Sequence, residues 1–307
     1  MRLLPLFVLV PWLGACGSDS ETEAVDVGPE TDPLDYTFQT GDWEVPTGDV
    51  FECFYTGAVT DKDLAVRGAI GAPASGLHHV TVYYTDQVSA PEHHPCLDAE
   101  MINWHQIAGA GGEADAAFGL PEGLAARVPA GSQLVVQVHY INTTGAPFMR
   151  NDSVTLDVID PAKVVEYANY QATLDLDFTI PAMQSFTSRT VCTVKEDTQA
   201  VLLLGHMHEW GKHFTLERLD ADGSVAEVLY DEEWDPMYST NPPVLRYDMA
   251  TPLLLHAGTK LRQTCVWDNT ESEALEFPRE MCLSFMHYFP DDGERLLACL
   301  PEDSDGG

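Results

Sequence analysis

Short apolar runs rich in β-branched and aromatic residues recur along the chain, and Gly, Pro, Asn and Asp separate them. Such runs are typical of strands, and no segment holds a helical period apart from one possible turn at residues 114–118. The pattern favours an all-β fold, which we expect to form two tandem, jelly-roll-like antiparallel β-sandwich domains. The expected strands are residues 51–55, 64–69, 79–84, 133–140, 154–159, 186–194, 201–204, 213–219, 225–230, 253–255, 260–266 and 281–288.

The length and charge of the chain limit its domain count and its partners. With 307 residues, 45% of them hydrophobic, the chain can build two cores, and we expect a first domain at residues 36–160 and a second at 161–307. No charged linker separates the two, so the domains are expected to abut. A net charge of −34 with only 15 Lys and Arg argues against binding to nucleic acid or to anionic membrane surfaces.

The first residues read as an export signal. An apolar stretch at residues 3–13 is short for a membrane span, and the tetrapeptide Leu-Gly-Ala-Cys ending at Cys16 resembles a bacterial lipobox. We expect residues 1–16 to be a lipoprotein signal peptide with Cys16 lipidated, and an ordinary secretory signal is the alternative. Gly17, rather than Asp, favours anchoring in the outer membrane of a bacterial cell envelope. Residues 17–35 contain acidic but no basic side chains and are expected to form a disordered tether.

Six further cysteines are dispersed along the chain without a Cys-x-x-Cys pair. An even number of separated cysteines in an exported protein is typical of disulfides, whereas closely spaced pairs would indicate a zinc site. These cysteines are Cys53, Cys96, Cys192, Cys265, Cys282 and Cys299.

A His-x-His motif, His206 and His208, follows the apolar run at residues 201–204. Side chains on a strand alternate between its faces, so both imidazoles would point the same way, with Met207 opposite, and could bind one metal ion. Two imidazoles leave a metal under-coordinated, so the motif needs further ligands elsewhere in the chain. The alternative is two strand histidines that are hydrogen-bonded to their neighbours.

Three more histidines come from the first half of the chain. His78 and His79 begin a strand, so both can reach one metal only if the chain bends there or if one ring uses its other nitrogen. His139 lies with Gln137 on one face of its strand, opposite the apolar face. Together the three histidines would form a three-nitrogen site suited to copper or zinc.

Met281 shares one face of its expected strand with Phe285 and His287. Core packing would explain a methionine there, but a thioether added to the His-x-His motif would favour soft Cu(I) over zinc. His287 lies six residues beyond Met281, roughly 20 Å along a strand, which is too far to join the same metal. His93 and His94 are expected in an exposed, Pro-bounded loop. The remaining histidines, expected to be surface or hydrogen-bonded core residues, are His105, His213 and His256.

The order His-His, Gln-Val-His-Tyr, His-x-His and Glu-Met-Cys resembles the copper type II, ascorbate-dependent monooxygenases, the family of peptidylglycine α-hydroxylating monooxygenase and dopamine β-monooxygenase. The resemblance runs from about residue 51 to residue 300. It implies two copper ions per chain, with a copper-site cleft between the domains. The implied ligands are His78, His79 and His139 for an electron-transfer copper, and His206, His208 and Met281 for the catalytic, oxygen-binding copper. The implied disulfides are Cys53–Cys96, Cys192–Cys299 and Cys265–Cys282.

The activity implied by the resemblance is hydroxylation of a C–H bond of a small-molecule substrate by dioxygen, with ascorbate as electron donor. Peptide-amidating members carry an Arg two residues before the His-x-His motif, where this chain has Leu204. They carry a Tyr four residues after the methionine ligand, where this chain has Phe285. We therefore do not expect peptidylglycine as the substrate, although the second half resembles the dopamine enzyme in its Glu-Met-Cys and His-Tyr-Phe-Pro segments.

Three other functions are compatible with these motifs. A non-catalytic copper-binding envelope lipoprotein, for storage or sensing, would use the same six ligands, and only ascorbate-dependent oxygen consumption coupled to a product separates it from an enzyme. A zinc hydrolase with one three-histidine site is disfavoured by Met281 and by the lack of a well-placed general base. A structural adhesin with coincidental histidines is the most distant alternative.

Overall fold

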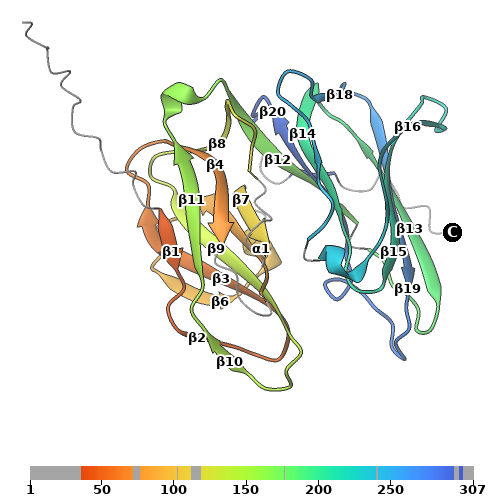
Figure 1. Cartoon of the computed structure of the whole chain (residues 1–307), viewed down its shortest axis with the longest axis horizontal. Helices are drawn as coiled ribbons and strands as arrows, with labels where there is room; N and C mark the ends of the chain where they lie inside the picture. Colours follow the sequence, from red (N-terminus) through yellow and green to blue (C-terminus); the bar gives the residue numbers. More distant parts are fainter. Residues whose placement is uncertain are drawn as a thin grey trace, which may run out of the picture. The chain divides into compact units, whose positions relative to one another are not determined.

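Strands make up almost all of the regular structure of the chain (Figure 1). The computed structural model describes residues 36–71, 77–101, 103–111, 119–175, 177–239, 241–293 and 297–299. The expected signal peptide with Cys16, the tether and the possible turn at residues 114–118 lie outside these ranges. Within them, the helical elements are the single turn α1 (Asp98–Met101) and the 3-10 turns η1 (Pro161–Lys163) and η2 (Pro236–Ser239). The expectation of an all-β fold is confirmed.

Each of the expected strands is present, with ends that differ by a few residues. The strands of the first half are β1 (Thr37–Gln39), β2 (Trp43–Val45), β3 (Gly48–Val59), β4 (Leu64–Gly71), β5 (Leu77–Thr85), β6 (Glu92–Pro95), β7 (His105–Gly111), β8 (Leu124–Val128), β9 (Gln133–Asn142), β10 (Phe148–Arg150) and β11 (Ser153–Ile159). The strands of the second half are β12 (Glu166–Asp175), β13 (Ser185–Thr193), β14 (Thr198–His206), β15 (Gly211–Leu219), β16 (Val225–Glu233), β17 (Leu245–Arg246), β18 (Leu253–Leu255), β19 (Lys260–Asp268), β20 (Cys282–Phe289) and β21 (Leu297–Cys299).

Strands that the sequence did not predict are mostly very short or poor in β-branched residues. β2, β10 and β17 have two or three residues each, and β7 carries Gly and Ala at most of its positions. β6 corrects one expectation, because His93 and His94 lie in this strand rather than in a loop. It is held by antiparallel pairing to β3, a contact distant in sequence that local patterning cannot reveal.

The strands form two sandwiches that share one long sheet. In the first half, the sheet β6-β3-β9-β5-β7 packs against the strands β1-β11-β4-β8. In the second half, the strands β12-β20-β14-β17 pack against the sheet β13-β19-β15-β16. The parallel pairing of β8 with β12 joins β1-β11-β4-β8 to β12-β20-β14-β17 in one ten-stranded sheet. The described residues therefore belong to one compact unit, and the expected division near residue 160 stays a prediction.

Each sandwich has its own apolar core, built from the inward-facing alternate residues of its strands. In the first, Val136 and Val138 of β9 and Val80 of β5 pack with Leu64 and Leu124 of the opposite sheet. The core of the second half contains Leu203, Met286, Phe214, Trp267 and Leu216. Burial of these side chains holds the two sheets of each sandwich face to face. It also fixes which residues of each strand point out of the core.

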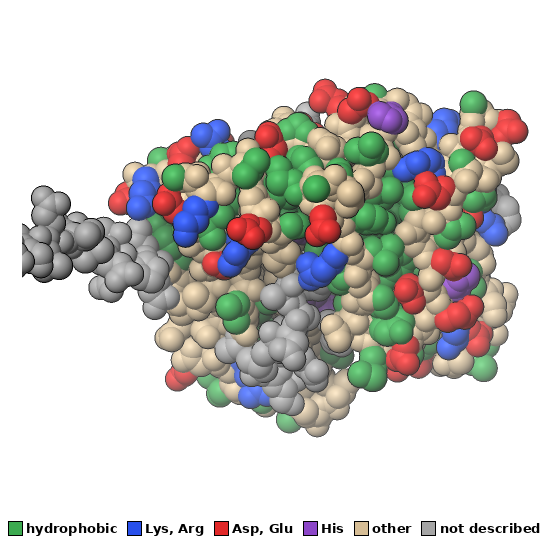
Figure 2. All heavy atoms as spheres, turned by 45° about the horizontal axis from the view of Figure 1, so that its top comes forward, with side chains coloured by type: hydrophobic (Ala, Val, Ile, Leu, Met, Phe, Trp, Pro, Cys, Tyr) green, Lys and Arg blue, Asp and Glu red, His purple; other side chains and the backbone are tan. Residues whose placement is uncertain are grey.

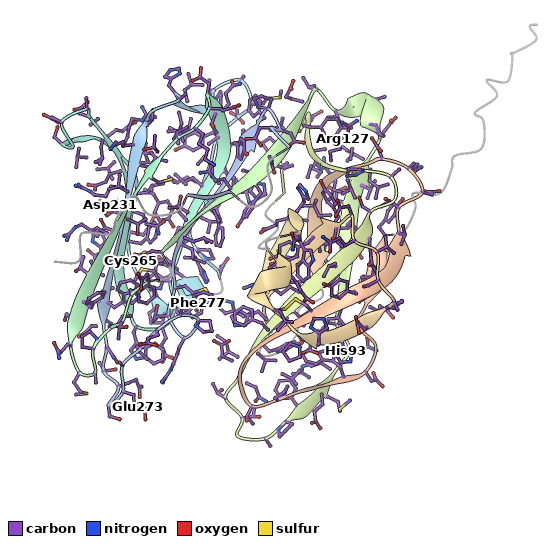
Figure 3. The ribbon with its side chains drawn as sticks, turned by 180° about the vertical axis from the view of Figure 1, so that it is seen from behind. His93, Arg127, Asp231, Cys265, Glu273 and Phe277 are labelled. Carbon is purple, nitrogen blue, oxygen red and sulfur yellow. A yellow bond between two sulfur atoms is a disulfide. The ribbon has the colours of Figure 1, made fainter. Side chains whose placement is uncertain are left out.

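Two of the three predicted disulfides are present. Cys53 on β3 is bonded to Cys96, next to the end of β6, and Cys265 on β19 is bonded to Cys282 on β20. The second bridge joins the two sheets of the second sandwich, and Figure 3 labels Cys265 beside it. Cys192 is also disulfide-bonded, but the side chain of its predicted partner, Cys299, lies outside the described residues.

Charged side chains are dispersed over the surface. Figure 2 shows acidic and basic side chains scattered among apolar and polar ones on one face. Several basic residues pair with neighbouring carboxylates, among them Arg67 with Asp157 at 2.7 Å and Arg218 with Glu227 at 3.0 Å. No helix among the described residues is long and apolar enough to cross a membrane.

Candidate metal centre

A β-bulge at His78 brings two neighbouring histidines to the same side of β5. Leu77 pairs with Tyr140 of β9, whereas His79 pairs with His139, so β5 contains one extra residue at this point. A bulge of this kind bends the strand and turns consecutive side chains toward one face. The candidate nitrogen atoms of His78, His79 and His139 consequently lie within 4.8 Å of one another. The bend that a shared site requires at this His-His pair is therefore present.

The ring of His139 is held by two residues of β3. Phe51 stacks on the ring with centroids 3.7 Å apart, and an oxygen of the Asp49 carboxylate lies 2.5 Å from His139 Nε2. The opposite nitrogen, His139 Nδ1, is buried without a hydrogen-bond partner. A carboxylate that binds one nitrogen of a histidine orients the ring and directs the lone pair of the other nitrogen to a metal. Asp49 therefore prepares His139 Nδ1 to act as a ligand.

The His-x-His motif lies at the end of β14 rather than inside a strand. β14 ends at His206, and the chain then turns at residues 208–211 before β15 begins. Met207 is fully buried in the core of the second sandwich, so the histidines on either side of it face the other way, as expected. His208 Nδ1 donates to the carbonyl of Arg279 at 3.1 Å, which leaves His208 Nε2 buried without a partner. His208 is therefore also oriented for metal binding through a defined nitrogen.

The carboxylate of Glu280 ties the His-x-His segment to the segment that carries Met281. It accepts hydrogen bonds from the backbone N–H groups of His208, Trp210 and Met281 and from the indole of Trp267, at 2.8–3.2 Å. The side chain is fully buried; burial raises the pKa of Glu280 to about 7, and these four donors oppose that rise. One buried carboxylate therefore holds the backbone on both sides of the second candidate site.

The pairing of β14 with β20 and a shared bond to Glu280 bring the backbones of Met281 and His208 together. In the pairing of β14 with β20, His206 lies opposite Leu283, and Leu204 lies opposite Phe285. His208 and Met281 lie just beyond these paired residues, at the neighbouring ends of the two strands. Met281 is buried, and its backbone N–H binds the same Glu280 oxygen as the N–H of His208.

The two sets of histidines adjoin each other. The ring of His78 lies 5.9 Å from that of His206 and 5.7 Å from that of His208, measured between centroids. The rings of His139 and His208 are 6.1 Å apart. We call these five residues, His78, His79, His139, His206 and His208, the histidine cluster. The cleft predicted between two separate copper sites is not seen between these rings.

Burial keeps the histidine cluster neutral. Burial is the largest cause that lowers the pKa of each of the five, and the neighbouring imidazoles lower the pKa further for the four members other than His208. For His208, the Arg279 carbonyl and the Asp49 carboxylate oppose the lowering. Neutral imidazoles offer lone pairs, so the cluster is chemically suited to bind metal ions.

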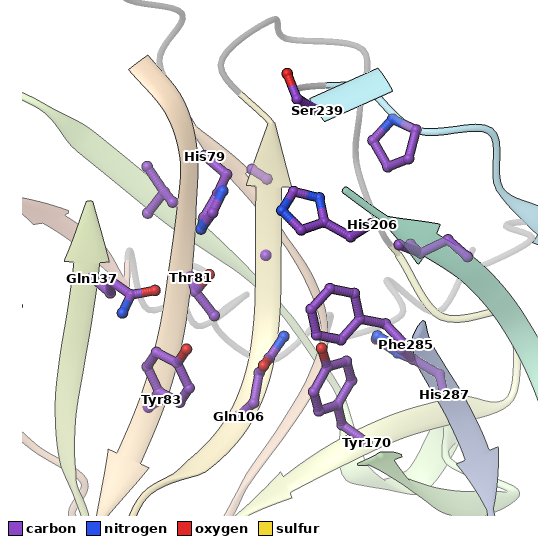
Figure 4. Close-up of a pocket in the computed structure, with 15 residues that line it drawn as sticks. His79, Thr81, Tyr83, Gln106, Gln137, Tyr170, His206, Ser239, Phe285 and His287 are labelled. Atoms are coloured by element: carbon purple, nitrogen blue, oxygen red, sulfur yellow. The ribbon is translucent and has the colours of Figure 1, made fainter. Parts of the chain in front are cut away.

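A cavity of about 140 Å³ lies beside the histidine cluster (Figure 4). His79 of the first half and His206 of the second line one end of it. At the other end, Figure 4 shows Gln106, Tyr170 and His287. Because both sandwiches contribute to the walls, the cavity places a small molecule in contact with histidines of both candidate sites.

Several functional residues were missed by sequence reasoning. Asp49, Gln106 and Tyr170 belong to no recognisable motif, and only the fold brings them to the site. Glu280 is adjacent to Met281, and its position in the Glu-Met-Cys segment was a signal that could have found it. His287 was correctly placed away from the methionine, but its position in the cavity wall was not foreseen.

The remaining histidines lie elsewhere. His93 contacts Glu52 at 2.6 Å, and His213 contacts Asp231 at 2.7 Å. His105 stacks on Tyr84 with ring centroids 4.5 Å apart, and His256 lies 3.5 Å from a carboxylate oxygen of Asp197. Glu209 is exposed in the turn after His208, as expected for a solvated carboxylate.

The available donors fit copper. Five imidazoles supply borderline nitrogen ligands, three of them with a buried nitrogen atom that has no other partner, and Met281 supplies a soft thioether. Histidine with a thioether is a donor set favoured by Cu(I), whereas structural zinc sites use thiolate and imidazole.

Comparison with known proteins gives one informative match. Residues 168–304, which include His206, His208 and Met281, match the family model described as copper type II ascorbate-dependent monooxygenase, C-terminal domain. No curated protein matches the chain with significance. Among solved structures, a chain of "Structure of infectious bursal disease virus Gx strain" aligns at 8% identity over 87% of this chain and 74% of that chain, with a TM-score of 0.18. A likeness at that TM-score carries no argument about fold or function.

Proposed function

We propose that the chain is a copper- and ascorbate-dependent monooxygenase that hydroxylates a C–H bond of a small-molecule substrate. The observation that carries this proposal is the histidine cluster, in which buried nitrogen atoms of His78, His139 and His208 have no hydrogen-bond partner. A buried polar atom without a partner is costly, and metal coordination removes that cost. The family match of residues 168–304 supports copper as the metal and monooxygenation as the reaction.

Two copper ions per chain are proposed, each held by three ligands. The first would be held by His78, His79 and His139, whose nitrogens lie within 4.8 Å of one another. The second would be held by His206, His208 and Met281, which lie at the neighbouring ends of β14 and β20. The proximity of the two sets supports electron transfer between them over a short path.

The chain itself orients the ligands and shields the site. Asp49 and the Arg279 carbonyl fix the ring orientation of His139 and His208, and the buried Glu280 fixes the backbone beside Met281. When bound, copper supplies one-electron redox chemistry and the activation of dioxygen. The overall reaction, R–H + O₂ + 2e⁻ + 2H⁺ → R–OH + H₂O, balances with ascorbate as the source of the two electrons and two protons.

The cavity is the proposed substrate site. It brings a bound molecule against His206, and its walls come from both sandwiches. A substrate held between walls from both sandwiches has the C–H bond that reacts in a fixed position.

Copper content tests this function. The chain lacking residues 1–16 is loaded with copper, dialysed and analysed beside Met281→Ala, with the exposed Met149→Ala as a matched control. We expect two copper ions per chain in the parent and in Met149→Ala, and loss or weakening of one in Met281→Ala. With ascorbate and a hydroxylatable substrate, ¹⁸O from ¹⁸O₂ should appear in the product. Two bound copper ions without turnover would instead support the non-catalytic copper-binding lipoprotein, and one tightly held zinc would refute both.

We also propose that the protein is lipid-anchored at Cys16 in the outer membrane of a bacterial cell envelope. The tetrapeptide that ends at Cys16 and the acidic stretch after it support this location. Metabolic labelling with a fatty-acid analogue tests it. The parent chain should be labelled in the membrane fraction, whereas Cys16→Ser should be unlabelled; equal labelling of the two would refute the anchor.

A further inference from the structure

The cavity beside the histidine cluster has no charged wall. Fifteen described residues line it, and none of them is Asp, Glu, Lys or Arg. Two charged residues outside the lining act on it: Arg246 helps to lower the pKa of His287, and Asp49 opposes the lowering of the pKa of His79. Transfer of an ionised group from water into such a site is unfavourable because no opposite charge replaces its hydration. The cavity therefore selects against carboxylates and ammonium groups.

One wall of the cavity is a continuous row of rings. Phe285 lies 6.1 Å from His206 and stacks on Tyr170 with centroids 5.5 Å apart. Tyr170 in turn contacts His287 edge to face at 5.3 Å. The row runs from the proposed second copper site to the far end of the cavity, as Figure 4 shows. A planar apolar ligand can stack or pack edge-on along such a row.

The lining also contains small residues that leave room for a flat ligand. Gly109 and Ala110 of β7 contribute almost no side chain to it. The volume of about 140 Å³ suits a single six-membered ring with a short substituent, since an engineered apolar cavity of about 150 Å³ in another protein binds benzene. A fused ring system or a peptide would extend beyond this volume.

The end of the cavity away from the cluster carries neutral hydrogen-bonding groups. The side chain of Gln106 interacts with the Tyr170 hydroxyl, and His287 is uncharged near neutral pH because burial lowers its pKa to about 4. An amide, a phenol and a neutral imidazole can together donate to and accept from a hydroxyl or amide group. They provide no charge to pair with an ion.

We infer that the cavity binds an uncharged substrate with one aromatic ring, whose neutral hydroxyl or amide group is held by Gln106, Tyr170 and His287. The ring packs along Phe285, and the end of the molecule beside His206 presents the C–H bond to be hydroxylated. The identity of the reaction rests on the proposed function, whereas the binding preference does not.

Ligand binding to the copper-free chain tests the inference without any turnover. Three probes of matched shape are compared by calorimetry: 2-phenylethanol, phenylacetate and 2-phenylethylammonium. We expect 2-phenylethanol to bind at least tenfold more tightly than either ion. Equal or tighter binding of an ion, or saturation by none of the three, would overturn the inference.

Two substitutions test the walls separately. Leu204→Arg places a guanidinium in the cavity opposite Phe285 and should shift the preference toward phenylacetate by at least tenfold, whereas Leu254→Arg, at an exposed position, should not. Gln106→Leu should weaken binding of 2-phenylethanol at least fivefold and change the affinity for ethylbenzene by less than twofold. An unchanged probe order in a folded Leu204→Arg variant, or equal losses for both probes in Gln106→Leu, would refute the assigned walls.

The outcomes separate the two proposals. Tight binding of 2-phenylethanol by a protein that consumes no oxygen with ascorbate would retain the binding site and refute the monooxygenase. Hydroxylation of charged aromatic compounds at least as fast as neutral ones would retain the monooxygenase and refute the substrate class.

Discussion

Leu204 of β14 and Phe285 of β20 lie directly opposite each other across an antiparallel pair, and both line the cavity beside the histidine cluster. The resemblance noted from sequence places an Arg and a Tyr at these two positions in peptide-amidating enzymes. Here the pair forms one apolar surface two residues from His206. The wall that would hold a peptide carboxylate is therefore changed at both of its contributing strands, while the candidate ligands beside it are all present.

Glu280→Gln should weaken the second candidate copper site. An amide cannot accept all four N–H donors that the Glu280 carboxylate binds, and its own NH₂ group would face one of them. We expect a loss of about 3 kcal/mol in the free energy of unfolding, because the buried hydrogen-bond network of this side chain is broken. Urea denaturation measures the loss, and X-ray absorption of the copper-loaded variant should show reduced sulfur coordination.

Glu227→Gln is the matched control for this change. Glu227 pairs with Arg218 at the surface, where its side chain is half exposed. Its substitution should cost less than about 1 kcal/mol and leave copper binding unchanged. Equal effects of the two substitutions would show that Glu280 has no special role in holding the site.

Asp49→Asn should impair the first candidate site. The amide keeps the shape of the side chain but removes the negative charge that holds His139 Nε2. Loss of a carboxylate that orients a histidine ligand typically lowers metal affinity by about 10- to 100-fold. Copper titration followed by electron paramagnetic resonance should report this loss at one of two sites, whereas the exposed Asp177→Asn should behave as the parent. A parent-like titration of Asp49→Asn would remove this residue from the proposed site.

Gly205→Ala should disturb the strand end that carries His206. A Cβ at this position would lie 2.4 Å from the ring of Phe214, which is fully buried in the core of the second sandwich. The ring cannot move away without displacing its neighbours, so we expect a destabilisation of about 2 kcal/mol. Thermal unfolding measures it, with Gly57→Ala on β3 as a control whose Cβ has its nearest contact at 3.5 Å. Similar melting temperatures for Gly205→Ala and the parent would contradict the close packing.

The strands and the face of each histidine could be predicted because both follow from local alternation. On β9, Val136 and Val138 are buried in the core, and Gln137 and His139 face the other way, as the pattern indicated. On β20, Met286 packs in the core, and Phe285 and His287 line the cavity. A period of two residues fixes these faces once a strand is buried on one side.

The geometry that completes the site depends on contacts that are distant in sequence. The bulge at His78 arises from the register of β5 on β9, and Asp49 reaches His139 only because β3 pairs with β9. Glu280 is 72 residues from His208, whose backbone it binds. None of these relationships leaves a periodic signal, so the sequence predicted the candidate ligands without predicting what orients them.

His287 should make the copper-free protein less stable in acid. Burial, together with nearby Arg246, lowers the pKa of His287 to about 4 in the folded chain, against about 6.5 in the unfolded chain. Between these two values the unfolded state binds a proton that the native state does not, so stability falls as the pH falls from 6.5 to 4. The contribution of this one group amounts to about 3 kcal/mol across the window.

His287→Phe isolates this contribution, because other groups titrate in the same range in both proteins. The histidine cluster affects stability in the same direction as His287. The contribution of Glu280 has the opposite sign: because its pKa is raised to about 7, it lowers the free energy of unfolding as the pH rises from about 4.5 to 7. Urea unfolding of parent and variant at a series of pH values therefore yields a difference that should change by about 3 kcal/mol between pH 6.5 and pH 4 and stay constant above pH 7. A difference that does not vary with pH would mean that the His287 ring accepts a proton in the folded state as readily as in water, which is incompatible with its burial in the cavity wall.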